Sequence, residues 1–495
     1  MLFTTAAFLL LFLPVTLLGF YAIGGRSSHG AAAWLMLASV FFYGYWMPEF
    51  VLLLLTSITA NFTIGRRIVG SVRQGRPAAS RRWFILGIVL NLAALAYFKY
   101  FNFFIENIGA LFGTDWKLGK IILPIGISFY TFTQIAFLFD ALAGKVNEAN
   151  PVHYGLFVTY FPHLIAGPVL HHSQMMPQFA NPSIYRSRAD HLIGGLAILA
   201  LGLFKKVVLA DGIAPYADAV FGASETGAMP GLGEAWVGAL AYTLQLYFDF
   251  SGYSDMAIGL SWMFNVRLPF NFDSPYRAQS IADFWRRWHI SLSNFLRDYL
   301  YIPLGGNRGG QTRRYLNLAV TMVLGGLWHG ASWLFVAWGA LHGLYLVVNH
   351  GYRAWLGPIL LARLQSSRVY RAACWALTLL VVVVAWVFFR AESMAAATRM
   401  LSAMFDPLAA TAASADLLWN AGLPMDRGLI GCFVLGAAVL YLPNSNRIGA
   451  SLLARLSTAG PQRPMLAGAL LGGVAMLLLI NATRDSVSAF IYFNF

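Results

Sequence analysis

The stretch FILGIVLNLAALAYF (84–98) contains no charged residue, and similar runs recur from one end of the chain to the other. Two further examples are LIGGLAILALGLF (192–204) and MLAGALLGGVAMLLLI (465–480). A helix of about 20 apolar residues crosses the roughly 30 Å hydrocarbon core of a bilayer. These runs are continuous, whereas a membrane strand has about 10 residues of alternating character. Because a helix satisfies its own backbone hydrogen bonds in lipid, the pattern predicts an all-α, polytopic membrane helix bundle.

The composition supports the same fold class. Of the 495 residues, 58% are hydrophobic and 11% are charged, against about 25% charged residues in an ordinary soluble protein. The formal net charge is +14, and the basic residues lie between the apolar runs. In those positions they set the topology and contact anionic lipid headgroups. The charge therefore predicts membrane lipids as partners and gives no reason to expect nucleic-acid binding.

A series of apolar segments are candidate membrane spans, and several are short or interrupted by proline and glycine. We expect about 11 full crossings, with the remaining segments re-entrant or amphipathic. Non-helical backbone at membrane depth is tolerated only inside protein or beside a cavity, so the broken segments are candidates for lining one. The candidate spans are 3–23, 31–46, 49–63, 83–104, 121–143, 152–170, 192–212, 233–262, 316–328, 332–349, 373–389, 428–443 and 465–482.

The basic segments orient the bundle. Segment 64–82 carries six arginines and no acidic residue, and segments 275–315, 353–371 and 444–464 are also rich in arginine. Segment 213–231 contains neither lysine nor arginine. Because cytoplasmic loops carry an excess of basic residues, we place the basic segments in the cytoplasm. This assignment places the N-terminus, segment 213–231 and the C-terminal tail on the outer side.

No pattern in the sequence is typical of a metal site. Cys374 and Cys432 both lie in apolar runs, which argues against a disulfide framework and against a cysteine metal cluster. His163 lies near His171 and His172, but no carboxylate or cysteine stands nearby at ligand spacing. We therefore expect no metal ion.

Segment 269–314 has the highest density of polar residues. Within it, Trp285 and other apolar residues recur at helical spacing, and polar residues such as Asn294 fall largely elsewhere around the helix. The pattern predicts one amphipathic helix near the cytoplasmic face, with its tryptophans at headgroup level. His289 lies one turn after Trp285 and therefore faces the apolar side or its edge. A surface helix and a channel or donor-binding role for Trp285 and Asn294 both remain open.

His329 lies between apolar stretches in GGLWHGASW (325–333). A histidine at that depth must be hydrogen-bonded or line a wet cavity, because an unsatisfied polar group there costs several kcal/mol. A structural role is open, but neutral imidazole is also a competent base toward a hydroxyl group. Such a base would help a hydroxyl attack a thioester carbonyl, and Trp328 or His289 would stabilise the oxyanion. His342 falls off the same helical face, so we expect it only to pack.

Two other groups are candidates for a channel or for donor binding. Asp249 and Asp255, in QLYFDFSGYSD (245–255), either line a pathway or pair with lysine or arginine. In PLGGNRGG (303–310), backbone N–H groups and Arg308 suit the phosphates of a nucleotide-bearing donor. This second signal is weak, because the G-K-[ST] element of a phosphate-binding loop is missing.

The aromatic end of the chain, FIYFNF (490–495), has two readings. Aromatic residues commonly anchor a segment at the membrane interface. Alternatively, the phenol of Tyr492 accepts an acyl group and passes it on.

Several stretches together resemble the membrane-bound O-acyltransferase (MBOAT) superfamily, in particular its bacterial alginate O-acetylation branch. The similarity runs from about residue 1 to 350 and reappears at the C-terminus. The stretches are LPIGISFYTFTQIAFLFD (123–140), FPHLIAGPV (161–169), LGLFKKVVLAD (201–211), YFDFSGYSDMAIG (247–259), FWRRWHISLSNFLRDYLYIPLGG (284–306), GGLWHGASW (325–333) and the FIYFNF end.

The resemblance implies a ring of tilted transmembrane helices around a central channel, within a single domain over residues 1–495. His329 matches the family's near-invariant histidine, and His289 matches its second active-site polar position. Tyr492 matches the tyrosine of the C-terminal motif, for which an acyl-relay role is expected. The implied layout is N-terminal helices (1–120), a catalytic core (121–350), C-terminal helices (351–489) and the aromatic tail (490–495).

The resemblance also implies an activity. An acetyl group from a cytoplasmic thioester, acetyl-CoA or another acyl thioester, would cross the bacterial inner membrane for O-acetylation of an exported polysaccharide. A separate periplasmic acetyltransferase would complete delivery, and no bound cofactor is needed because the thioester supplies the driving force. Alginate is the first choice of polymer, with cellulose, peptidoglycan or another exopolysaccharide open. The alternatives are a transporter of a lipid-linked sugar or anion and a relative that acylates protein or lipid.

Overall fold

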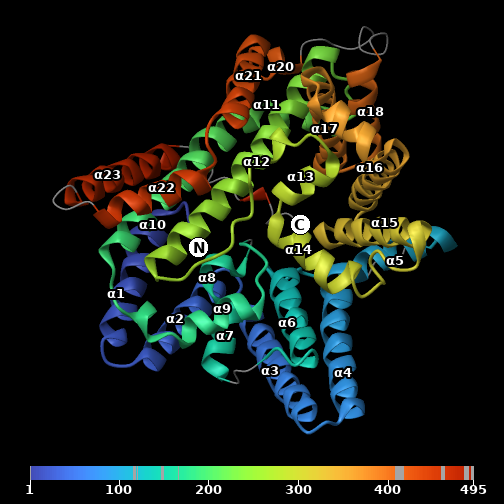
Figure 1. The fold of residues 1–495 in the computed structure, drawn as a ribbon. Coiled ribbons are helices and arrows are strands. Elements are labelled where there is room, and N and C mark those ends of the chain that lie inside the picture. The colour runs from blue at the N-terminus through green and yellow to red at the C-terminus, as the bar shows by residue number, and fades with distance from the viewer. Residues whose placement is uncertain are drawn as a thin grey trace. The chain divides into compact units, whose positions relative to one another are not determined.

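The computed structural model describes residues 2–114, 119, 121–146, 150–165, 167–406, 417–458, 463–483 and 490–491. Within these ranges every regular element is a helix (Figure 1), which confirms the predicted all-α class. The chain divides into two compact units that are each discontinuous in sequence. The first comprises Met1–Leu203, Tyr253–Phe270 and Arg447–Phe493, and the second comprises Phe204–Gly252 and Asn271–Asn446 among the described residues. The single domain with a core at 121–350 stays a prediction.

The helices before Leu203 belong to the first unit, and α10, α12 and α22 contribute residues to both units. The elements of this part of the chain are η1 (Ala7–Phe12), α1 (Leu13–Gly24), α2 (Ser28–Gly44), η2 (Pro48–Phe50), α3 (Val51–Arg73), α4 (Pro77–Leu95), η3 (Ala96–Tyr100), α5 (Phe101–Phe112), α6 (Ile127–Leu142), α7 (Pro151–Thr159), α8 (Phe161–Leu164), α9 (His172–Ala180), η4 (Pro182–Tyr185), α10 (Ala189–Phe204), α12 (Leu232–Met263), α22 (Ser445–Thr458) and α23 (Arg463–Ala482).

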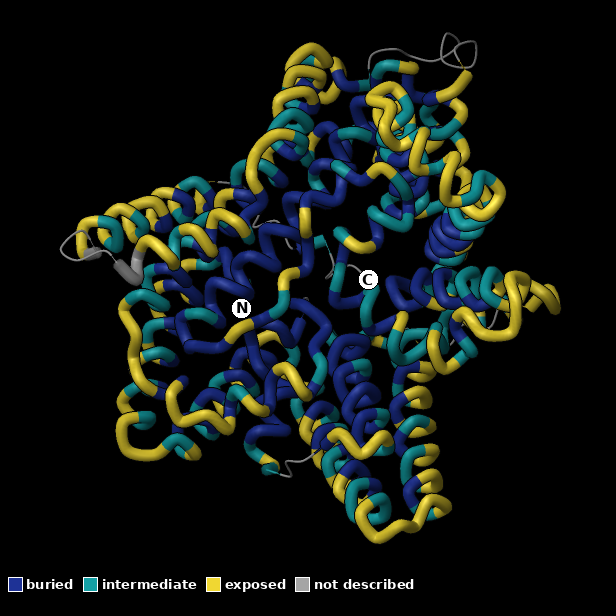
Figure 2. Tube along the Cα trace, in the orientation of Figure 1, coloured by how far each residue is buried: buried dark blue, intermediate teal, exposed yellow. Residues whose placement is uncertain are grey.

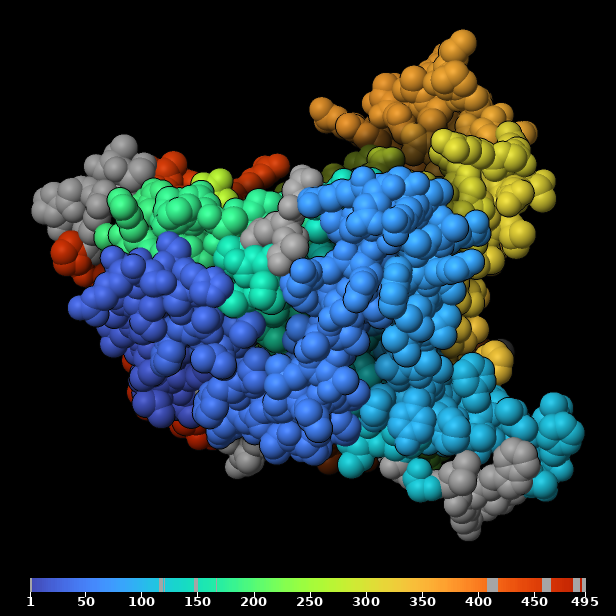
Figure 3. All heavy atoms as spheres, turned by 90° about the horizontal axis from the view of Figure 1, so that it is seen from below, coloured from blue at the N-terminus to red at the C-terminus, as the bar shows by residue number. Residues whose placement is uncertain are grey.

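In the first unit, α3, α4 and α6 pack against one another. Figure 2 shows α6 buried along its length, while α3 and α4 carry exposed residues on their outer faces. The surface made by the N-terminal helices is drawn in blue in Figure 3. Asn91 Nδ2 donates to Asn61 Oδ1 at 2.6 Å, so an amide pair joins α4 to α3. A Cβ at Gly87 would lie 2.6 Å from Leu138 of α6, so glycine permits this close approach.

The second unit contains both candidate histidines, His289 and His329. Its other elements are η5 (Lys205–Ala210), α11 (Asp211–Glu225), η6 (Pro275–Arg277), α13 (Ile281–Arg287), α14 (Ile290–Leu296), η7 (Arg297–Tyr301), α15 (Gly310–His329), α16 (Trp333–Ser366), α17 (Arg368–Arg390), α18 (Met394–Phe405), α20 (Leu417–Asn420) and α21 (Met425–Tyr441). Its core is aromatic, with Trp288, Trp338 and Trp386 each fully buried.

Six helices among the described residues are long and apolar enough to cross a membrane, or seven if one bent pair is a single span. These helices confirm a polytopic membrane protein, while the expectation of about 11 crossings stays a prediction. The six are Ala7–Gly24, Pro48–Arg73, Pro77–Phe112, Ala189–Glu225, Arg368–Arg390 and Pro464–Ala482, and the bent pair is Met425–Tyr441 with Ser445–Arg455.

The prediction of a single amphipathic helix in segment 269–314 is wrong. The structure has two short helices, α13 and α14, separated at His289. The interruption has a tertiary cause: the Asn271 carbonyl accepts from Ile290 N at 3.0 Å, and the Arg287 carbonyl accepts from Asp273 N at 2.9 Å. The backbone of residues 271–273 thus takes hydrogen bonds that a continuous helix would make itself. Trp285 is 9% exposed, so it packs inside the protein and does not face lipid headgroups.

Helices α15 and α16 form a closely packed pair in the second unit. Glycines on both helices permit the short distance between their backbones. A Cβ added at Gly326 would overlap the carbonyl oxygen of Phe335, and one added at Gly339 would overlap the carbonyl oxygen of Met322. Small residues at helix contacts in membranes permit this kind of backbone approach.

Replacing Gly326 with alanine is expected to lower the free energy of unfolding by about 1–3 kcal/mol, because the added methyl forces the two helices apart. Thermal unfolding in detergent, followed by tryptophan fluorescence, measures the change. Gly436→Ala is the matched control, since Gly436 of α21 has no neighbouring atom within 4 Å of an added Cβ. Equal midpoints for the two variants would contradict the proposed role of Gly326.

Candidate active site

His329 is the last residue of α15 and is 4% exposed. The helix ends there because Gly330 takes an extended backbone, with φ −169° and ψ 152°. The next helix begins at Trp333, where the side chain of Ser332 caps its N-terminus by accepting from Leu334 N at 3.2 Å. The break between two helices therefore presents the imidazole inside the second unit, rather than toward lipid.

Aromatic rings surround His329. Its ring centroid lies 4.9 Å from that of Trp328, 5.1 Å from that of Trp338 and 5.2 Å from that of Phe389. Such packing fixes the orientation of the imidazole and lowers the local dielectric constant. Electrostatic interactions with a reacting group are stronger in such an environment than in water.

His289 is fully buried and has the left-handed backbone conformation, with φ 44° and ψ 54°. This conformation is uncommon for a residue other than glycine, and it often marks a functional position. The ring packs edge-on against Phe250, with 4.7 Å between centroids. His289 lies outside the helices that qualify as membrane spans. Burial lowers the pKa of His289 to about 3, so the imidazole is neutral at physiological pH.

The hydrogen bonds of Asn271 define the tautomer of His289. Asn271 Oδ1 accepts from the backbone N–H of Ser291 at 3.1 Å and from its hydroxyl at 2.9 Å. Because a backbone N–H can only donate, the atom facing it must be the amide oxygen. His289 Nδ1, 3.2 Å from the same oxygen, is therefore the donor in that contact. The neutral ring thus carries its proton on Nδ1 and has its lone pair on Nε2.

The structure brings His289 and His329 to one aromatic side chain. The Trp328 ring centroid lies 6.2 Å from that of His289 and 4.9 Å from that of His329. All three residues belong to the second unit. They come from two different segments, α15 and the turn between α13 and α14. Two imidazoles and one indole N–H thus form a compact set of groups suited to acyl transfer.

His342 belongs to the same aromatic cluster, which the sequence analysis did not predict. Its Nδ1 accepts a hydrogen bond from Trp285 Nε1 at 3.3 Å. Trp338 stands between the two histidines of the α15–α16 pair, with its centroid 4.8 Å from that of His342 and 5.1 Å from that of His329. As predicted, His342 packs inside the protein, at 0% exposed. The chain turns at Gly330, so the two histidines lie on different helices and not on two faces of one helix.

The sequence profile of the membrane-bound O-acyltransferase family matches residues 141–394. The peptidoglycan O-acetyltransferase of Helicobacter pylori is 40% identical over 432 residues, which cover 82% of this chain and 80% of that protein. The chain belongs to the membrane-bound O-acyltransferase family. It is therefore a membrane-bound acyltransferase, and the resemblance stated from its motifs is confirmed. Family membership favours acyl transfer over the transporter hypothesis.

Two further relatives are also bacterial proteins. The probable alginate O-acetylase of Pseudomonas aeruginosa is 45% identical over 410 residues, which cover 82% of this chain and 75% of that protein. The teichoic acid D-alanyltransferase of Streptococcus thermophilus is 29% identical over 252 residues, which cover 47% of this chain and 57% of that protein. His289 and His329 both lie within the part of this acyltransferase that matches the family profile.

The two aspartates proposed as channel residues lie in different units. Asp249 is 1% exposed, and its Oδ1 lies 2.6 Å from Lys206 Nζ. The same ammonium group lies 2.8 Å from Asp211 Oδ1. Asp249 is thus part of a buried ion pair of the second unit, which is the pairing alternative left open by the sequence. Asp255 is also buried, at 4% exposed, and belongs to the first unit.

Two of the remaining candidates lie on or near α14 and α15, and the third lies outside the described residues. Asn294 is half-buried on α14. Arg308 is exposed in the segment between η7 and α15, where Gly305 and Gly309 have φ of 113° and 86°. Tyr492 lies outside the residues that the structure describes, so its role as an acyl relay stays a prediction.

The histidines considered for a metal site make hydrogen bonds instead. His172 Nδ1 lies 2.8 Å from Asp140 Oδ2, and His163 Nε2 lies 3.0 Å from the carbonyl oxygen of Phe157. The carboxylate near His172 comes from α6, far from it in sequence, and the sequence analysis missed it. In the described part of the chain, no group of three histidine, cysteine or acidic side chains could hold a metal ion.

Proposed function

We propose that this acyltransferase takes an acetyl group from a cytoplasmic thioester and passes it across the bacterial inner membrane. The acetyl group then reaches hydroxyls of an exported polysaccharide, with an alginate-like polymer as first choice. Relatives at 40% and 45% identity carry peptidoglycan and alginate O-acetylation in their names, which supports acetyl transfer to a glycan. The observation that carries the proposal is the buried cluster of His289, Trp328 and His329.

In the proposed chemistry, the imidazole of His329 takes the proton of an acceptor hydroxyl while its oxygen attacks the thioester carbonyl carbon. The carbonyl oxygen becomes an oxyanion, and the indole N–H of Trp328 donates a hydrogen bond to it. Collapse of this intermediate breaks the C–S bond and forms the ester. The departing sulfur then receives the proton from the imidazolium of His329, which regenerates the base.

For His289 we propose a role other than that of the oxyanion donor. As an oxyanion donor it would need a proton on Nε2, but its proton is on Nδ1, facing Asn271. We infer that His289 Nε2 accepts a hydrogen bond in the site and orients a hydroxyl group. The phenol of Tyr492 is our candidate for the first acceptor hydroxyl, from which the acetyl group passes to the outer side.

The donor is acetyl-CoA or another acyl thioester, and the energy of the thioester makes a bound cofactor unnecessary. A separate periplasmic acetyltransferase completes delivery to the polymer. The positive-inside rule supports an orientation with both chain termini in the periplasm.

The test uses a bacterial strain that lacks its own copy of this gene and is complemented with the full-length chain. After growth with labelled acetate, mass spectrometry measures acetyl esters on the exported polymer, on lipids and on proteins. We expect label on the polymer only in the complemented strain. Label on a lipid or a protein alone would contradict the glycan proposal and favour a relative that acylates those molecules.

A further inference from the structure

A polar pocket of about 240 Å³ lies in the second unit. It is lined by α13 and the residues just before it, by α16 on both sides of a bend, and by the start of α17. The bend is at Gly357, which has φ 68° and is followed by Pro358. The backbone conformation at Gly357 thus lets residues from both arms of α16 line one pocket.

The pocket carries positive charge that the protein does not neutralise. Arg286, Arg353 and Arg371 line it and are exposed. Within the described ranges, none of these three guanidinium groups lies in an ion pair. One acidic residue, Asp283, also lines the pocket, and its Oδ1 lies 2.9 Å from Arg287 Nε. Segment 353–371 has no acidic residue at all.

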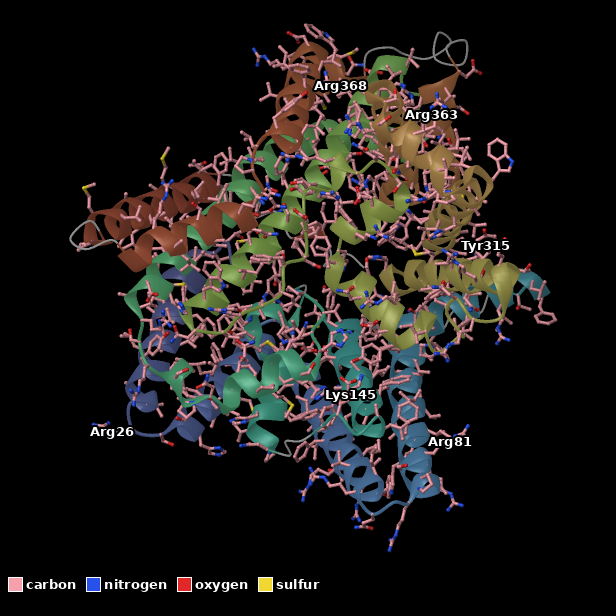
Figure 4. All side chains as sticks on the ribbon, viewed as in Figure 1. Arg26, Arg81, Lys145, Tyr315, Arg363 and Arg368 are labelled. Atoms are coloured by element: carbon pink, nitrogen blue, oxygen red, sulfur yellow. The ribbon has the colours of Figure 1, made fainter. Side chains whose placement is uncertain are left out.

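Further cations lie around the pocket. Arg363 and Arg368, near the junction of α16 and α17, are both exposed (Figure 4). His350 precedes the bend on α16, and its Nδ1 lies 3.0 Å from Arg314 Nη2. Burial lowers the pKa of His350, and so do Arg314, Arg353 and Arg286. The neighbouring arginines thus disfavour another positive charge and favour an anion.

Neutral polar groups complete the lining. The hydroxyls of Tyr352 and Tyr370 are 3.3 Å apart. The side-chain amide of Asn349 also lines the pocket. Several guanidinium groups beside neutral hydrogen-bonding side chains match the chemistry of a phosphate ester, because guanidinium binds phosphate oxygens in bidentate fashion.

Aromatic contacts connect this pocket to the catalytic cluster. Arg286 follows Trp285 in α13, and the Trp285 centroid lies 5.8 Å from that of Trp338. Trp338 in turn lies 5.1 Å from His329. Two aromatic side chains therefore stand between the wall of the pocket and His329. Both α13 and segment 353–371 belong to the arginine-rich parts of the chain that the positive-inside rule places in the cytoplasm.

We propose that this pocket binds the phosphate-bearing part of the thioester donor while the acyl end reaches His329. The inference rests on the proposed function, since it concerns the donor of the same reaction. Phosphate is common to coenzyme A, to the prosthetic group of an acyl carrier protein and to anionic lipid headgroups. The donor is favoured because the pocket lining is polar and its wall continues into the aromatic cluster around His329.

The test measures binding without chemistry. The full-length protein is placed in nanodiscs of phosphatidylcholine, and adenosine 3′,5′-bisphosphate is titrated into it by calorimetry. We expect saturable binding that the combined Arg286→Ala, Arg353→Ala and Arg371→Ala variant weakens by about 100-fold or more. The control is Arg26→Ala, which removes one exposed arginine from the turn between α1 and α2 (Figure 4) and should bind as the unchanged protein does. Inorganic phosphate should bind more weakly at the same site.

Kinetics and lipid composition distinguish the sources of phosphate. With acetyl-CoA as donor, the triple variant should show a KM raised by about 100-fold and a kcat within about threefold of the original, as expected when binding remote from the reacting bond is lost. Unchanged nucleotide binding and KM in a folded triple variant would overturn the proposal. The proposal would also be overturned if, in mixed-lipid nanodiscs, the triple variant retained less phosphatidylglycerol than the original protein but bound the nucleotide equally well. Nucleotide binding in a protein that transfers no acetyl group would contradict the proposed function instead.

Discussion

The His329→Ala variant is expected to lose acetyl transfer by a factor of about 10²–10⁴, while the protein remains folded and present in the membrane. The reason is that alanine cannot accept the proton of the attacking hydroxyl. The remaining rate then depends on positioning of the donor and on the hydrogen bond from Trp328. The measurement is the initial rate of thiol release from acetyl-CoA together with acetyl ester formed on the polymer.

Two controls accompany this variant. His29→Ala removes an exposed imidazole of α2 and should leave the rate unchanged. His329→Gln keeps a hydrogen-bonding group of similar size but cannot act as a base at neutral pH, so its rate should be as low as that of His329→Ala. A glutamine variant with close to the original rate would show that His329 only packs or donates a hydrogen bond, and the proposed base would be wrong.

The second large effect is expected at His289, where a pair of substitutions separates catalysis from backbone strain. His289→Ala and His289→Gly both remove the imidazole, and each should lower acetyl transfer by about 10²-fold or more. They differ in stability, because φ of 44° suits glycine and costs alanine about 1 kcal/mol. The glycine variant should therefore unfold at a higher temperature than the alanine variant.

Thermal unfolding and the acetyl-transfer rate are measured on the same preparations of these two variants. Equal losses of activity at different stabilities would assign the effect to the missing imidazole. If the glycine variant regained the original rate, His289 would serve only to hold the turn between α13 and α14. Asn271→Ala is a further comparison, because it keeps the imidazole but removes the oxygen that receives the Nδ1 proton.

His329 and His289 show which features of the site can be predicted from neighbouring residues in the sequence and which cannot. His329 was a candidate because burying an ionisable side chain in an apolar stretch costs free energy, so such a residue is expected to be functional. This inference needs only the residues that neighbour His329 in the sequence. His289 was also a candidate, but in the wrong local structure. A helical pattern of apolar residues does not show that Asn271 and Asp273 pair with the backbone and interrupt the helix.

His342 and the pocket arginines were harder to predict. His342 joins the cluster only because α15 and α16 pack against each other, which depends on glycines whose role appears in the contact between helices. Arg286, Arg353 and Arg371 come from three helices, and no motif connects them. Basic segments in a membrane protein are expected at the cytoplasmic face in any case. Their positions in sequence therefore indicated topology and gave no sign of a binding site.

The sequence by itself determined the membrane class, the all-α architecture and the family, because run length, composition and short motifs are properties of contiguous residues. Tertiary structure alone decided that Lys206 pairs with Asp249, that Trp328 contacts both candidate histidines and that three arginines share a pocket. The physical reason is that these features depend on distances between side chains far apart in the chain. Hydropathy and helical period restrict such distances only weakly, whereas close packing of the helices in the folded chain sets them.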